Sequence, residues 1–153
     1  MKIQILTLFV LCILMAACSN SPKPVLAPEK IFEDPDMHVI TSVFNKKSGI
    51  TSTLYGNKLA LEAARNESEN HVAGEIFKLV TWELQPNPYW FGGNINGEEK
   101  CVETVKVLPA ENGIRVDYEV ENNGGDVLKR YDPDKQERIN FIFDQTASVF
   151  PQR

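Results

Sequence analysis

The chain has 153 residues, of which 42% are hydrophobic and 24% charged, and its formal net charge is −5 at pH 7. This composition is that of an ordinary globular protein, and it excludes a polytopic membrane protein, a disordered tail and a disulfide-dense scaffold. An acidic balance gives no electrostatic field for capturing phosphates, so no nucleic-acid partner is expected.

The first residues predict a secretory targeting segment. Lys2 supplies a positive charge, residues 3–15 carry none, and the small residues Ala16 and Ala17 follow. This order is that of a signal peptide. The apolar stretch is about 15 residues long, which is shorter than the roughly 20 residues that a membrane-spanning helix needs.

The end of this segment, LMAAC from Leu14 to Cys18, resembles a bacterial lipobox. The resemblance implies that residues 1–17 are a lipoprotein signal peptide and that Cys18 carries two or three acyl chains, enough for stable membrane anchoring. Because Ser19 follows, it also implies a place on the periplasmic face of the outer membrane if the host is Gram-negative. The alternatives are an ordinary signal peptide with a chance cysteine, or a short uncleaved anchor.

The mature chain predicted in this way has one free thiol. Cys12 leaves with the signal peptide, Cys18 becomes a thioether, and Cys101 remains. No intrachain disulfide is then possible. A lone thiol in an oxidising compartment is buried, reactive or paired between chains. The strand-like surroundings of Cys101 favour a buried structural cysteine.

Proline content divides the rest of the chain. Pro22, Pro24, Pro28 and Pro35 fall within residues 18–36 and favour an extended chain, which we interpret as a tether that lifts the domain off the membrane. Residues 37–153 are then one globular domain.

Periodicity predicts the elements of this domain. Residues 38–44 and 50–55 are β-branched and aromatic around a turn, which indicates a hairpin. Asn57 is placed to cap a helix over about residues 58–70. Strands are expected at 75–84, 99–108 and 114–120, with a return at 127–131 and a last strand at 138–143, where Ile139, Phe141 and Phe143 alternate. The predicted fold class is α+β, a mainly antiparallel sheet with one or two flanking helices.

The sequence contains few residue patterns that indicate a catalytic, metal-binding or cofactor-binding site. The two histidines, His38 and His71, belong to no HxH, HExxH or CxxC spacing, so no metal site is predicted. His71 and Glu75 could share a strand face, but two ligands do not make a site, and a structural histidine is the simpler interpretation. There is no CxxCH motif for covalent haem, no GxSxG motif and no GxGxxG motif in its helical context. No catalytic residue and no cofactor are predicted.

The most unusual stretch is PNPYWFGGNING, residues 86–97, in which Tyr89, Trp90 and Phe91 stand among prolines and glycines. One interpretation is an aromatic-walled pocket or a recognition surface, to which the glycines allow close approach. The other is a loop that plugs the end of the sheet, with the aromatic rings in the core.

Several motifs, in order, resemble the cytochrome P-460 family. They are TLYGN at 53–57 with Ala60, Ala64 and Arg65, LVTW at 79–82, PYWFG at 88–92 with Ile95 and Gly97, and Val102, Glu103 and Val105. The resemblance covers roughly residues 52–107. It implies an antiparallel sheet with flanking helices, often dimeric, so a homodimer is an expected partner. That family's best-known members are periplasmic c-type cytochromes.

This chain departs from the family pattern because residues 141–153 contain no cysteine or histidine, so the haem site does not carry over. The expected function is therefore a lipid-anchored envelope protein that acts as a non-catalytic binding or structural module, with an unknown ligand. The alternative is a periplasmic redox or gas-binding protein that carries non-covalent haem.

Overall fold

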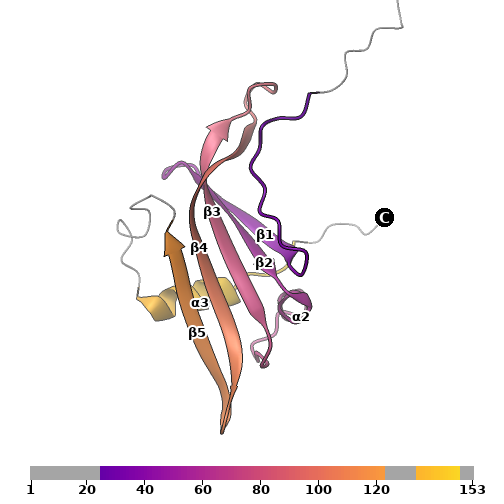
Figure 1. Cartoon of the computed structure of the whole chain (residues 1–153), viewed down its shortest axis with the longest axis vertical. Helices are drawn as coiled ribbons and strands as arrows, with labels where there is room; N and C mark the ends of the chain where they lie inside the picture. Colours follow the sequence, from indigo (N-terminus) through magenta and orange to yellow (C-terminus); the bar gives the residue numbers. More distant parts are fainter. Residues whose placement is uncertain (1–24, 123–133, 149–153) are drawn as a thin grey trace, which may run out of the picture.

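The computed structural model describes residues 25–122 and 134–148, which form one antiparallel sheet and two helices (Figure 1). The elements are β1 (His38–Asn45), β2 (Ile50–Gly56), α2 (Lys58–Arg65), β3 (Ile76–Pro86), β4 (Asn94–Ala110), β5 (Gly113–Asn122) and α3 (Lys135–Phe143). The strands pair in chain order, β1-β2-β3-β4-β5. The predicted α+β class with a mainly antiparallel sheet is confirmed.

Local sequence patterns predicted most of the helices and strands correctly. The β1–β2 hairpin is confirmed, and Asn57 caps α2 by accepting a hydrogen bond from the amide of Ala60. The helix is shorter than predicted and ends at Arg65. Strand β4 is longer than predicted, since it begins at Asn94 and continues the β3–β4 hairpin beyond the rest of the sheet. The predicted strand at 127–131 lies outside the described residues.

The predicted last strand at 138–143 is wrong, because these residues belong to helix α3. Asp134 caps that helix by accepting from the amide of Gln136. Ile139 and Ile142, three residues apart, are the pair that it buries. Side chains three apart share a helix face, so helical geometry places both on the sheet, whereas a strand would send them to opposite faces.

Both helices contribute to a core on one face of the sheet. Gly56 permits the close approach of α2, since a Cβ there would lie 2.6 Å from Ile40 Cδ1 and 2.8 Å from Ala60 Cβ. The buried residues of this core are Ile40, Leu54, Ala60, Ala64, Phe77, Leu79, Val105, Ile139 and Ile142. They come from β1 to β4 and from both helices, so α2 and α3 hold the sheet from the same side.

An extended segment, residues 25–36, covers part of the other face, and we call it the strap. Phe32 packs on Tyr55 with ring centroids 5.0 Å apart, and Tyr55 contacts Trp82 edge to face. Lys78 Nζ lies 2.8 Å from an Asp34 carboxylate oxygen. This part of the predicted tether, residues 25–36, forms no helix or strand. It packs against the sheet because Phe32 covers the apolar cluster around Tyr55.

Candidate functional site

The residues predicted to form an aromatic-walled pocket or a recognition surface lie at an exposed turn. Tyr89, Trp90 and Phe91 occupy the β3–β4 turn, and their side chains are 60%, 74% and 104% exposed. The interpretation as a core plug is wrong, and the three rings do not line the pocket described below. They are exposed because the hairpin continues past the neighbouring strands, where none of the described helices or strands covers it. Cys18, the predicted lipid site, lies outside the described residues.

The turn itself is well defined. The amide of Asn87 donates to the carbonyl of Gly93 at 2.9 Å, and the amide of Gly93 donates to the carbonyl of Trp90 at 3.0 Å. Gly92 has φ +78°, which glycine adopts without steric cost. The three aromatic residues are therefore held in a short hydrogen-bonded turn.

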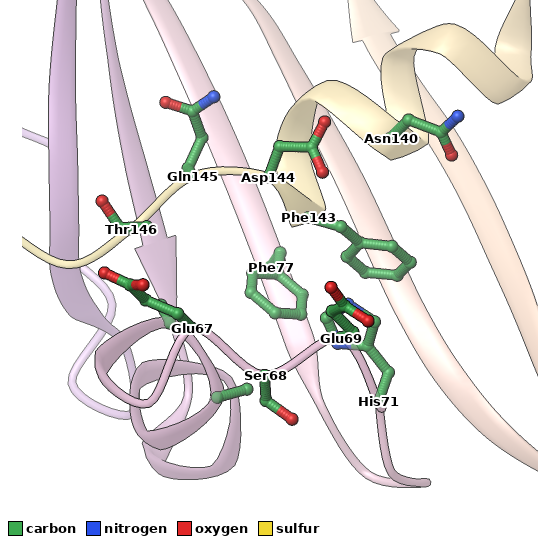
Figure 2. A pocket seen from close by; sticks show the side chains of 12 residues that line it. Glu67, Ser68, Glu69, His71, Phe77, Asn140, Phe143, Asp144, Gln145 and Thr146 are labelled. Carbon is green, nitrogen blue, oxygen red and sulfur yellow. The ribbon is translucent and has the colours of Figure 1, made fainter.

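A pocket of about 340 Å³ opens on the helix side of the sheet, where α2 and α3 both end (Figure 2). Its size falls within the usual range for small-molecule sites. It is lined by Ala63, Ala64, Glu67, Ser68, Glu69, His71, Phe77, Asn140, Phe143, Asp144, Gln145 and Thr146. These residues come from α2, the α2–β3 connection, β3 and the end of α3, so only the folded chain brings them together.

His71 is paired with a buried carboxylate at the edge of the pocket. Its Nδ1 lies 2.6 Å from Glu75 Oε2, and Glu75 Oε1 accepts from the amide of Val72 at 3.1 Å. The Glu75 residue is only 1% exposed. With Nδ1 engaged by a buried carboxylate, Nε2 is the ring nitrogen left for a ligand.

Aromatic packing fixes the plane of this imidazole. The His71 ring stacks on Phe143 with centroids 3.7 Å apart, and it meets Phe77 edge to face at 5.9 Å. The His71 side chain is therefore held by the Glu75 carboxylate and by two aromatic rings. The pair does not share a strand face, because both residues precede β3. Sequence reasoning considered His71 and Glu75 but missed the pocket, whose other wall comes from α3, more than 60 residues later.

Negative charge dominates the pocket. Glu67, Glu69 and Asp144 line it, and its lining contains no lysine or arginine. In addition, α2 and α3 both end there, and the C-terminal end of a helix carries a partial negative charge. The pocket therefore presents an aromatic floor under a negative potential, an environment that favours cations.

Backbone strain occurs at one of these carboxylates. Glu67 has φ 49°, and it is the one described non-glycine residue with positive φ. The amide of Ser68 donates to the carbonyl of Ala63 at 3.0 Å, the bond of a Schellman helix end, at which glycine is the usual left-handed residue. A glutamate at this position therefore lowers the free energy of unfolding by about 1 kcal/mol relative to glycine.

Catalytic machinery is not assembled around His71 in the part of the chain that the structure describes. The nearby hydroxyl of Ser68 donates to the carbonyl of Asn70 at 3.0 Å. Among residues 25–122 and 134–148, no group of three or more His, Cys, Asp or Glu side chains is arranged to hold a metal ion.

Cys101 is buried, as predicted. It lies on β4 opposite Thr81 and does not line the pocket. Burial, and secondarily the charge of Glu103, raise the pKa of its thiol. This thiol is therefore a packing residue.

No known protein family and no curated protein matches this chain. The P-460 resemblance therefore stays a prediction from motifs. Within the described ranges, neither helix has the length and apolar character needed to cross a membrane.

Proposed function

We propose that this chain is a lipid-anchored protein of the cell envelope and a non-catalytic binding module, whose pocket holds a small organic cation. The lipobox ending at Cys18 supports the anchor. The observation that carries the ligand class is the convergence of Glu67, Glu69 and Asp144 with two helix C-termini over the rings of Phe77 and Phe143.

The chemistry of the pocket suits an ammonium group with a small apolar body. Carboxylates and helix ends attract the charge. Aromatic faces contact the alkyl groups and attract a cation through their quadrupole. His71, oriented by Glu75, adds a nitrogen for one hydrogen bond. A volume of about 340 Å³ accommodates such a molecule but excludes a folded peptide segment.

Calorimetry with a set of small ions tests the ligand class. The probes are tetramethylammonium, choline and butylammonium, with acetate as the anionic control. The ammonium ions should bind and acetate should not. Glu69→Gln and Asp144→Asn should each weaken binding by about five- to tenfold, because each removes a charge near the ligand. Glu111→Gln, a matched change at the distant β4–β5 turn, should have no effect. Equal binding of acetate, or no binding by any ammonium ion, would contradict the proposal.

Labelling tests the anchor. The wild-type protein should incorporate radioactive palmitate and sediment with membranes, whereas Cys18→Ser should do neither. A variant that stays both labelled and membrane-bound would exclude lipidation at Cys18.

The alternative function, non-covalent haem binding, would depend on His71, because it is the histidine that lines the pocket. Haem titration separates the two proposals. A stoichiometric Soret band that is lost in His71→Ala would support haem, whereas no band after haem addition would exclude it.

A further inference from the structure

We propose that the β3–β4 turn inserts into the membrane interface and forms a second contact beside the lipid on Cys18. This inference rests on the proposed lipid anchor, which sets the end of the molecule that faces the bilayer. It concerns Tyr89, Trp90 and Phe91, which form the insertion tip. The pocket does not use these residues, and no described layer covers them.

The side chains of the tip match the interface of a bilayer. Phe91 is fully exposed, Trp90 is 74% exposed, and Tyr89 is 60% exposed. Tryptophan and tyrosine concentrate at membrane–water interfaces because each combines an apolar ring with a polar group. Figure 1 shows the β3–β4 turn at the top of the molecule, beyond the end of the other strands. A projecting turn can enter the headgroup layer without exposing the backbone of the sheet.

The strap places the anchor at this same end. The amide of Lys30 donates to the carbonyl of Asn96 at 3.2 Å, and the Asn96 side chain donates back to the carbonyl of Lys30 at 3.2 Å. The strap therefore runs beside the β3–β4 hairpin, and its first described residues lie near the turn (Figure 1). Cys18 is seven residues before Val25, so the two are at most about 25 Å apart. This length allows the lipid on Cys18 to enter the bilayer at the end of the molecule where the tip lies.

Exposed charges of both signs lie at this end, the carboxylates of Glu29 and Glu98 and two lysines of the β1–β2 turn. The β1–β2 turn lies beside the base of the projecting hairpin, where the amide of Leu84 donates to the carbonyl of Gly49 at 2.9 Å. Lys46 and Lys47 in that turn are exposed. Lysines near a surface of anionic lipid are attracted to it.

Fluorescence of the lipidated full-length protein tests the proposal. The mature protein is reconstituted into vesicles of phosphatidylethanolamine and phosphatidylglycerol that contain brominated phosphatidylcholine, a contact quencher. The chain has two tryptophans, of which Trp82 is 1% exposed and serves as an internal reference. The emission of Trp90 should shift to the blue and be quenched by the bromine. In the matched variant Trp90→Phe, the remaining emission of Trp82 should be unchanged by bromine.

Other outcomes separate the two proposals. Trp90 that stays in water and unquenched, in a protein whose Cys18 is lipidated by mass spectrometry, overturns insertion and leaves the anchor intact. Trp90 that is shielded from acrylamide but unquenched by bromine shows that a protein, a second copy included, covers the tip, and this also overturns insertion. An unmodified Cys18 with the protein free in solution overturns the anchor and, with it, the insertion that rests on it.

Discussion

Arg138 on α3 forms a bidentate ion pair with Glu103 on β4, with Nε 2.8 Å from Oε1 and Nη2 on Oε2. Glu103 is completely buried, and the hydroxyl of Tyr118 donates to the same Oε1 at 2.6 Å. The pKa of Arg138 is raised chiefly by its hydrogen bond to Glu103. The pair joins α3 to the sheet across 35 residues of sequence.

Removing Arg138 should therefore destabilise the fold strongly. Arg138→Met leaves a buried carboxylate without its cation, and we expect the free energy of unfolding to fall by about 3–5 kcal/mol in urea titrations. The double variant Glu103→Leu with Arg138→Met should recover most of this loss, because no buried charge remains. Lys106→Met, which breaks the exposed pair with Glu119, is the control and should change little. A small effect of Arg138→Met alone would show that the pair does not hold α3.

Cys101 should be unreactive in the native protein. Its pKa is raised by burial, so at pH 8 the thiolate that attacks reagents is scarce as well as inaccessible. Release of the chromophore from a disulfide reagent should be slow until urea unfolds the chain. The raised pKa also means that stability is fully present below the thiol pKa of the unfolded chain and declines as the pH rises above it. Rapid modification of the folded protein would contradict the buried position.

Glu67→Gly should stabilise the protein and weaken its binding of cations. Glycine adopts the positive φ of 49° without strain, so the free energy of unfolding should rise by about 1 kcal/mol, measured by thermal or urea denaturation. The same change removes a pocket carboxylate. The control is Glu62→Gly, inside α2, which should destabilise by about 1 kcal/mol and leave binding unchanged. Stabilisation with full binding would show that the Glu67 carboxylate does not face the ligand.

The strap should loosen in acid. The pKa of Asp34 is lowered, chiefly by its hydrogen bond from Lys78. The stability that this ion pair contributes is therefore fully present above the ordinary carboxyl pKa of about 3.9, and it is lost as the pH falls through the lowered pKa of Asp34. Because Lys78 Nζ lies over the Phe32 ring, 5.4 Å from its centroid, the ring proton shifts of Phe32 report the change. If the Phe32 ring proton shifts still change below about pH 4 in Asp34→Asn, another titrating group causes the loosening.

Much of the fold was predictable because its signals are local. The alternation of Ile114, Val116, Tyr118 and Val120 predicted β5, and the side chain of Asn57 predicted the start of α2. Both depend on geometry that repeats within a few residues. The exposed aromatic turn was recognised from its composition alone, although its exposure was not.

The sequence by itself determined strands β1 to β5, the capped helix α2, the buried thiol of Cys101 and the unusual turn at Tyr89–Phe91. Only the tertiary structure decided that residues 138–143 form a helix, that His71 meets Phe143, and that the strap lies against the sheet. Ile139, Phe141 and Phe143 have the spacing of a strand face, whereas Ile139, Ile142 and Phe143 have the spacing of a helix face, so the local pattern cannot choose between the two structures. The choice is made by burial of Ile139 and Ile142 against the sheet and by the ion pair of Arg138 with Glu103, and both contacts join segments far apart in the chain.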